Sequence, residues 1–304
     1  MFFFGKVNPF TLFCVEIRII TVKIDSMILL ADSGSTKTNW CLTENSVILK
    51  HIFTKGVNPF YQTEEEIIRD LEVSLVPYLK GIEIDQIYFY GAGCAFPEKI
   101  ALVSGALGWH FKNVSIEVQS DLVGAARSLF LDDKGIACIL GTGSNSCLYD
   151  GKKIIENVSP LGFILGDEGS GAVLGKTLIA DCLKNQLPPA LKDKLLSTYE
   201  LDAQMVLENV YKKPFPNRFL AKLTPFLLEN IKEPSIYKIV YDSFDAFFVR
   251  NVMQYPVENI QVGFVGSIAH YFHEVLEVVA AERGIKISQI VQNPLDGLVK
   301  YHSR

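Results

Sequence analysis

One short pattern occurs twice in this sequence, about a hundred residues apart. In each copy an apolar run leads into a turn of glycine, serine and threonine, and a second strand-like run then returns. The first copy is "MILLADSGSTKTNWCL" (27–42), and the second is "IACILGTGSNSCLYDG" (136–151). Two hairpins of one design at this separation predict two related domains that face each other.

The remaining segments alternate between strand-like and helix-like patterns. Thr63 and Glu66 form a capping box before a helix whose apolar stripe includes Ile67 and Leu71. The region 171–248 is helical and is interrupted by two proline-containing stretches, after which come a strand and a long helix near the end. This alternation predicts an α/β protein. Further strands are predicted at 86–93 and 115–120, and further helices at 97–107 and 121–131.

Composition narrows the class of protein. A chain of 304 residues with 49% apolar residues can form two domains of ordinary size or one large one. The net charge of −5 and the lack of a basic run argue against general binding of nucleic acid or anionic membranes. The six cysteines form no C-x-x-C motif, so neither a zinc site nor a cysteine-ligated iron–sulfur cluster is predicted. Reduced thiols in a cytoplasmic protein are the simplest interpretation.

The first 26 residues form a separate question. They are rich in apolar residues, but charges such as Glu16 and Arg18 interrupt them, and no span reaches the roughly 20 residues of a membrane helix. A basic start, a clean apolar centre and a cleavage site, which together mark a signal peptide, are not evident. We hypothesise that Met27 is the native start and that residues 1–26 are a spurious or dispensable extension.

The first turn has the composition of a phosphate-binding loop. Gly34 allows unusual backbone angles, so that N–H groups can converge on an anion. Ser35 and Thr36 add hydroxyl donors, and Lys37 adds a positive charge. Asp32, at the end of a strand, can orient a hydrated magnesium ion. The alternative is an ordinary hairpin with polar turn residues, and the Walker A pattern is absent.

The second turn strengthens this interpretation. Gly141 and Gly143 flank Thr142, and together they offer backbone and hydroxyl donors to a second set of phosphate oxygens, while Asn145 can reach a substrate. An ordinary glycine turn is again the alternative. Two such turns in matching strand contexts are harder to explain as coincidence.

Two later glycine-rich segments are further candidates. Asp167 and Glu168 lie among glycines directly before a helix, where acidic residues can simply cap the helix. The glycines beside them exceed what capping requires. In "VGFVGSIAHYF" (262–272), Gly266 and Ser267 lie between a strand and a helix, where a planar nucleoside can contact bare backbone.

Asp121 is the most notable single carboxylate. It follows the strand "SIEVQS" between the two hairpins. It can cap the following helix, or it can act as a general base that accepts the proton of an attacking hydroxyl.

Taken in order, these motifs resemble a known family. The sequences D-S-G-S-T-K-T, Q-S-D-L-V-G-A-A, L-G-T-G-S-N-S, G-D-E-G-S-G and V-G-S are similar to the phosphate-1, catalytic-aspartate, phosphate-2 and adenosine motifs of the sugar-kinase/Hsp70/actin superfamily. The similarity covers nearly all of 27–304, and within the superfamily it is greatest to N-acetylglucosamine kinases and BadF/BadG/BcrA/BcrD-type ATPases. It implies two ribonuclease-H-like domains of the actin-like ATPase fold, with ATP in the cleft between them.

The resemblance also implies roles for individual residues. Asp121 would be the catalytic base, and Asp32 would orient magnesium through water. Serines at 33 and 35 replace glycines that are frequent in relatives, and Phe163 replaces a tryptophan of some animal relatives, which leaves the sugar open. The implied ATP contacts are Ser35, Thr36, Lys37, Thr142, Gly143, Gly266, Ser267 and Ile268, and the implied sugar contacts are Asn58, Ser144, Asn145, Gly162 and Asp167.

The expected activity is ATP-dependent phosphorylation of an amino sugar, foremost N-acetylglucosamine at its 6-hydroxyl. The expected cofactors are ATP and Mg²⁺, with a homodimer as the possible assembly and neither nucleic acid nor membrane as partner. The alternatives are an ATPase that activates a partner enzyme, a non-catalytic sugar sensor, and a kinase for glucosamine or N-acetylmuramic acid. The predicted domains are 27–134 and 135–287, the second with a helical insertion, and a carboxyl-terminal helix of about 288–304 that packs back on the first.

Overall fold

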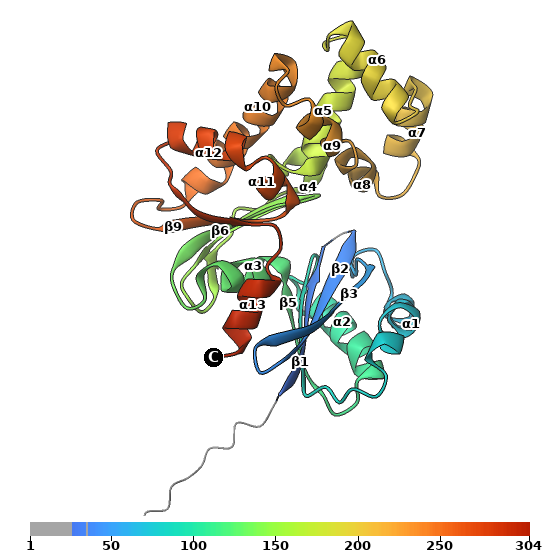
Figure 1. Ribbon diagram of the computed structural model, residues 1–304, viewed down its shortest axis with the longest axis vertical. Helices are drawn as coiled ribbons and strands as arrows, with labels where there is room; N and C mark the ends of the chain where they lie inside the picture. Colours follow the sequence, from blue (N-terminus) through green and yellow to red (C-terminus); the bar gives the residue numbers. More distant parts are fainter. Residues whose placement is uncertain (1–25, 35) are drawn as a thin grey trace, which may run out of the picture.

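Two five-stranded sheets, each with its own helices, make up the protein (Figure 1). The computed structural model describes residues 26–34 and 36–304, so the hypothesis about residues 1–26 falls almost wholly outside the described residues. The predicted α/β class and the two domains are confirmed. The first sheet contains β1 (Met27–Ser33), β2 (Lys37–Glu44), β3 (Val47–Lys55), β4 (Gln86–Gly91) and β5 (Ser115–Ser120), and the second contains β6 (Gly135–Leu140), β7 (Ser144–Tyr149), β8 (Ile154–Glu156), β9 (Gln261–Val265) and β10 (Ile287–Val291).

The first sheet has the strand order β3-β2-β1-β4-β5. Strands β1, β2 and β3 are antiparallel, whereas β4 and β5 continue in parallel to β1. Helices α1 (Glu64–Ser74) and α2 (Pro97–His110) pack over one face of the sheet, where Trp40 is fully buried. The predicted capping box of Thr63 and Glu66 begins α1.

The second sheet repeats this plan in the order β8-β7-β6-β9-β10. Its outer face is covered by a helical region that lies between β8 and β9 in the sequence, together with the helices that follow β9 (Figure 1). These helices are α4 (Gly162–Leu165), α5 (Gly171–Leu183), α6 (Pro189–Thr198), α7 (Ala203–Tyr211), α8 (Pro216–Ala221), α9 (Thr224–Glu229), α10 (Pro234–Arg250), α11 (Ser267–Tyr271) and α12 (His273–Glu282).

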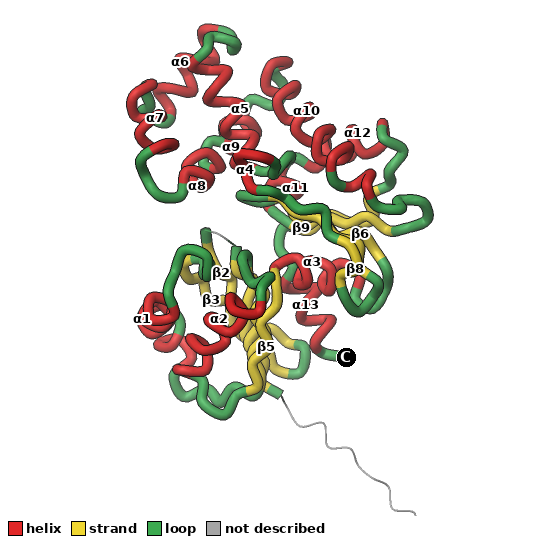
Figure 2. The backbone as a smooth tube through the Cα atoms, turned by 180° about the vertical axis from the view of Figure 1, so that it is seen from behind, coloured by secondary structure: helices red, strands yellow, loops and turns green. Residues whose placement is uncertain are grey.

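Two helices lie side by side between the sheets, α3 (Asp121–Phe130) and α13 (Leu295–His302) (Figures 1 and 2). The apolar face of α3 packs on the second sheet, while α13 packs on the first sheet against Leu30, Cys41 and Tyr90. The two helices approach so closely that a Cβ on Gly297 would lie 2.3 Å from the Ser128 carbonyl oxygen. The connections between the domains therefore form one tightly packed pair.

The structure corrects two predictions of local structure. The carboxyl-terminal helix does not begin near residue 288, because Ile287–Val291 form β10, the edge strand of the second sheet, and only α13 packs on the first sheet. The β-branched residues of this segment favour the extended chain. Asp121 is the first residue of α3, but the cap of that helix is Ser120, whose hydroxyl accepts from the Val123 N–H. The domain boundary at 134 and 135 stays a prediction, because α3 contacts both sheets.

Candidate active site

A cavity of about 580 Å³ lies between the two domains, at the ends of both hairpins. Asp121 and Asp32 line it, as does the linker from β10 to α13. Of the residues predicted to contact ATP or sugar, the cavity brings together Thr36, Lys37, Thr142, Gly143, Ser144, Asn145, Gly266 and Ser267.

The two hairpin turns face each other across this cavity. In the first turn the Gly34 N–H donates to the Lys37 carbonyl at 3.0 Å, and in the second the Gly141 N–H donates to the Gly143 carbonyl at 2.9 Å. The hydroxyl oxygens of Thr36 and Thr142 are 3.5 Å apart. The two turns are therefore close enough for both to contact one polyphosphate. Ser35, predicted as an ATP contact, lies outside the described residues.

Ser33, one of the serines that replace glycine, has a structural role. Its side chain is fully buried, and its hydroxyl lies 2.7 Å from the Thr38 hydroxyl across the hairpin. It also accepts from the Val57 N–H at 3.0 Å. This bonding ties the first hairpin to the segment that leads to Asn58, so that the serine stabilises the turn rather than disturbing it.

Both aspartates of the cavity have raised pKa values. Burial and the charge of Asp121 raise the pKa of Asp32 to about 7, while Lys37 acts in the opposite direction. Burial raises the pKa of Asp121 to about 6, although the N–H groups at the start of α3 lower it in part. The Leu122 N–H donates to Asp121 Oδ1 at 2.9 Å, which fixes the carboxylate. Both groups thus titrate near neutral pH, which suits proton transfer and cation binding.

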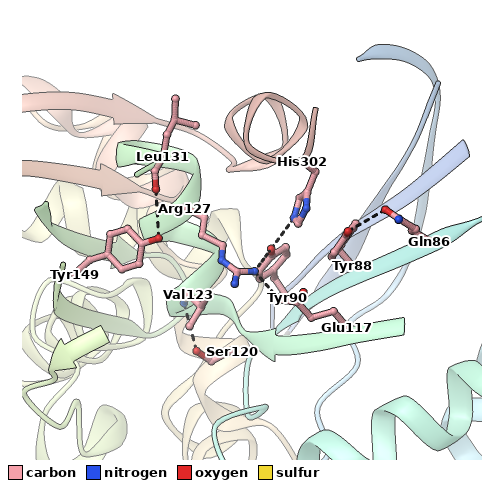
Figure 3. Close-up of polar contacts among 10 residues, drawn as sticks. All are labelled: Gln86, Tyr88, Tyr90, Glu117, Ser120, Val123, Arg127, Leu131, Tyr149 and His302. Atoms are coloured by element: carbon pink, nitrogen blue, oxygen red, sulfur yellow. Dashed lines mark hydrogen bonds and ion pairs between the residues drawn. The ribbon is translucent and has the colours of Figure 1, made fainter. Parts of the chain in front are cut away.

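A polar network holds α3, and with it Asp121, in place (Figure 3). Arg127 donates to the Tyr90 hydroxyl at 2.8 Å and forms an ion pair with Glu117 at 2.6 Å. The Tyr90 hydroxyl lies 2.8 Å from His302 Nε2 on α13. Burial and the nearby guanidinium of Arg127 lower the pKa of His302 to about 4, so the imidazole is neutral at pH 7. The network therefore joins α3, α13 and the first sheet behind the cavity.

The predicted sugar contacts occupy different positions. Ser144 and Asn145 line the cavity, whereas Asn58 and Gly162 do not. Asn145 Oδ1 already accepts from the Ser146 N–H at 2.9 Å and from Asn157 at 3.0 Å, so its amino group is what it can offer to a ligand.

Asn58 and Asp167 lie directly behind the cavity lining. The Asn58 oxygen accepts from the Phe60 N–H, and it would be 2.7 Å from a Cβ on Gly93, which itself lines the cavity. Asp167 Oδ2 would be 3.2 Å from a Cβ on Gly143. Burial raises the pKa of Asp167 to about 6, which the Ser144 N–H lowers in part. Gly93 and Gly143 thus separate the side chains of Asn58 and Asp167 from the cavity. Gly162 is the first residue of α4 and is exposed.

Gly266 forms part of the cavity wall at which adenosine is expected to bind. Gly266 has φ of 126°, and a Cβ there would lie only 2.2 Å from the Leu140 carbonyl oxygen. Ser267 begins α11 and lines the cavity, but the side chain of Ile268 is buried in the core of the second domain. A nucleoside at this wall would therefore meet the backbone of residue 268 and not its side chain.

The cavity also contains residues that the sequence did not indicate. Asn39 and Phe53 line it from β2 and β3, and residues 292–294 line it from the linker to α13. The signal for Asn39 was a polar side chain between Thr38 and Trp40, both of which are fully buried. Its significance depends on strand register, which the sequence alone does not give.

Comparisons with known proteins add to this geometry. No family model matches the chain, and no curated protein matches it. A candidate N-acetylglucosamine kinase from Porphyromonas gingivalis, solved by crystallography, is 47% identical and superposes with a TM-score of 0.89. The match covers 91% of this chain and 99% of the other.

The chain belongs to the family of N-acetylglucosamine kinases and BadF-type ATPases. Two further structures agree in fold with this family assignment. A candidate N-acetylglucosamine kinase from Chromobacterium violaceum has 15% identity and a TM-score of 0.71, with 91% of this chain and 99% of the other covered. A ROK-family glucokinase from Streptomyces griseus has 15% identity and a TM-score of 0.55, with coverages of 91% and 98%. The predicted actin-like ATPase fold is confirmed.

Within residues 26–34 and 36–304 no helix is long and apolar enough to cross a membrane. The same residues contain no group of three or more histidine, cysteine or acidic side chains placed to hold a metal ion. The five described cysteines are free and buried.

Proposed function

We propose that this protein transfers the γ-phosphoryl group of ATP to an amino sugar, foremost to the 6-hydroxyl of N-acetylglucosamine. The observation that carries the proposal is the pair of matching turns, with Thr36 and Thr142 only 3.5 Å apart, beside the Asp121 carboxylate in one cavity. The 47% identity to a candidate N-acetylglucosamine kinase supports the choice of sugar.

The two turns would hold the phosphates. Lys37 and Thr36 contribute a positive charge and a hydroxyl from the first domain, while Thr142 and the N–H groups beside it contribute neutral donors from the second. Phosphoryl transfer requires alignment and stabilisation of charge on the transferred group more than covalent chemistry by the protein. A cavity with many donors, and with no activated nucleophile among its described residues, fits this requirement.

The cavity also suits a hydrated magnesium ion. Mg²⁺ in kinases usually keeps several waters and binds one or two carboxylates together with substrate phosphates. Asp32 would orient such an ion through its waters. Burial and the charge of Asp121 raise the pKa of Asp32 to about 7. When bound, the ion would neutralise charge on the phosphate oxygens.

The sugar would bind at the other end of the cavity. We assign it to Ser144 and to the amino group of Asn145, with Asp167 and Asn58 within reach after closure of the domains around the substrate. Gly162, on the adjacent surface, would contribute only if α4 moves inward.

Asp121 would act as the general base. Its pKa, raised by burial to about 6, leaves it ionised at pH 7, so that it can accept the hydroxyl proton as the bond to phosphorus forms. Closure would exclude water and so limit hydrolysis of ATP.

The test is ADP release by the full chain with magnesium and ATP, measured against a panel of hexoses, hexosamines and N-acetylhexosamines. We expect strong stimulation by N-acetylglucosamine, with one sugar phosphate formed for each ADP. A larger stimulation by glucosamine or N-acetylmuramic acid would keep the kinase and change the substrate.

The same experiment addresses the alternatives. ATP hydrolysis that does not depend on sugar would indicate an activating ATPase, and bound sugar without turnover would indicate a sensor. The five described cysteines are buried within the chain, so they provide no support for a cluster shared with a partner subunit, as in an activator. The cytoplasmic location, the homodimer and the absence of nucleic-acid and membrane partners stay predictions.

A further inference from the structure

Asn39 carries an unusual atom for a residue in a ligand cavity. It lies on β2, and its side chain lines the cavity between the domains. Its Oδ1 is buried, and within the described residues it has no hydrogen-bond partner. Buried polar atoms of folded proteins nearly always have a partner, so an exception in a site points to a ligand or a bound water.

Strand pairing places Asn39 next to Asp32. The two residues are register partners on β2 and β1, and Phe53 is the partner of Asn39 on β3. Register partners point to the same face of a sheet and have Cβ atoms about 5 Å apart. All three residues line the cavity, so they form one row across the first sheet with Asn39 in the middle.

The nearby side chain of Lys37 does not donate a hydrogen bond to Asn39 Oδ1. Lys37 is two residues away and on the same face of β2, but its Nζ lies 5.9 Å above the ring of Phe53. Among the described residues no donor reaches this oxygen, which leaves it open to a bound species close to Asp32.

We propose that Asn39 Oδ1 accepts a hydrogen bond from a water of the hydrated magnesium ion that Asp32 orients, which makes Asn39 a cation-positioning residue. This inference rests on the proposed function. Water bound to Mg²⁺ is a strong donor, and the ion retains several such waters in nucleotide sites.

An amide provides the acceptor without placing a third negative charge in the metal-free cavity. Asp32 and Asp121 already share the cavity, and the charge of Asp121 raises the pKa of Asp32. A neutral acceptor orients the water without further repulsion between like charges.

The experiment measures binding of Mn²⁺, used in place of Mg²⁺, to the complex of the full chain with ADP. Free Mn²⁺ is counted by electron paramagnetic resonance at pH 8, and ADP affinity is measured separately with and without the metal. The variants are Asn39→Ala, which removes the acceptor, and Asn39→Asp, which retains an acceptor of the same shape. Gln186→Ala is the control, because Gln186 is an exposed amide that does not line the cavity and that donates to the Lys184 carbonyl at 3.0 Å.

We expect Asn39→Ala to weaken Mn²⁺ binding about fivefold to tenfold, as the loss of one hydrogen bond between an amide and a water implies. Asn39→Asp should bind Mn²⁺ at least as tightly as the wild type, Gln186→Ala should be unchanged, and ADP affinity without metal should be the same in all. Unchanged Mn²⁺ binding in Asn39→Ala, or a loss in Asn39→Asp of the same size, would overturn the inference.

Loss of ADP affinity that is equal with and without metal would instead assign the orphaned oxygen to the nucleotide, for example to a ribose hydroxyl, and would also overturn it. A wild-type chain that binds neither ADP nor Mn²⁺ would remove the proposed function together with this inference. Metal-dependent ADP binding that does not respond to Asn39 would remove the inference alone.

Discussion

The two domains have the same strand order but different chemistry at the hairpin that each presents to the cavity. The first sheet runs β3-β2-β1-β4-β5 and the second β8-β7-β6-β9-β10, so that β1 and β6 occupy equivalent positions. The first turn is flanked by Asp32 and Lys37, whereas the turn of the second hairpin, residues 141–146, contains only glycine, threonine, serine and asparagine. The fold thus provides two similar turns. The first contributes charged side chains to the cavity, and the second contributes neutral donors.

The two domains also share a glycine after the parallel strand next to the hairpin. Gly93 follows β4 with φ of 85°, and Gly266 follows β9 with φ of 126°. The neighbours differ, however. A Cβ on Gly93 would meet the side chain of Asn58, while one on Gly266 would meet the backbone carbonyl of Leu140. The second domain therefore tolerates a side chain less well at the position where a nucleoside is expected to bind.

The largest expected effect tests whether the Asp121 carboxylate on α3 is the general base. Asp121→Asn should keep sugar affinity and lose at least about 100-fold in turnover, because an amide cannot accept the hydroxyl proton. The measurement is steady-state ADP release with sugar. Asp132→Asn is the control, since Asp132 is exposed and pairs with Arg304 at the far end of the same helix. Near-normal turnover in Asp121→Asn would remove it from the role.

The next effect compares the hairpins directly. Lys37→Met should raise KM for ATP about 10- to 100-fold, because it removes a charged contact to phosphate, whereas Thr142→Val should raise it only about 2- to 10-fold, because it removes a neutral donor. Initial rates over a range of ATP concentrations measure both. A larger effect of Thr142→Val would reverse the proposed division between charged and neutral turns.

A third prediction concerns the two glycines. Gly266→Ala should lower Tm by at least about 5 °C, since both its φ and the Leu140 carbonyl oppose a side chain, and Gly93→Ala should cost less because a side chain can move away. Thermal unfolding followed by circular dichroism provides the comparison. Gly108→Ala, where a Cβ would meet nothing within 4 Å, is the control and should not lower Tm. Equal losses at 93 and 266 would contradict the account.

The smallest effect is a dependence on pH. Burial and Asp121 raise the pKa of Asp32 to about 7 from its model-compound value of 3.8, so the folded protein binds this proton more tightly than the unfolded chain does. The wild type therefore loses stability as pH rises from about 4 through 7. Asp32→Asn should remove this loss and raise Tm by at least about 2 °C at pH 8, with a smaller gain at pH 5.

Thermal scans at the two pH values measure this gain, with Asp242→Asn as an exposed control that pairs with Lys238 on α10. If the gain in Tm of Asp32→Asn were equal at pH 5 and pH 8, or absent at both, the folded protein would not disfavour the ionised form of Asp32.

Much of the arrangement could be predicted from local sequence patterns. The two turns, the capping box at Thr63 and the strand before Asp121 are signals carried by residues that are close in the chain. What could not be predicted depends on register and packing. The position of Asn39 beside Asp32 follows from strand pairing, and the burial of Ile268 follows from the packing of α11.

The carboxyl-terminal segment illustrates the same limit. The residues of β10 extend the second sheet because β9 offers an open edge, and no pattern within 287–291 announces that partner. Likewise, the raised pKa values of Asp32 and Asp121 arise from burial in the folded protein, to which the charge of Asp121 adds for Asp32.

The most direct test of the central claim follows the phosphorus atoms of ATP. Phosphorus NMR of the full chain with Mg²⁺, ATP and N-acetylglucosamine should show ATP converted to equal amounts of ADP and a sugar 6-phosphate, with little free phosphate. Release of free phosphate without sugar phosphate would contradict the claim that both turns and Asp121 act together on one transferred phosphoryl group.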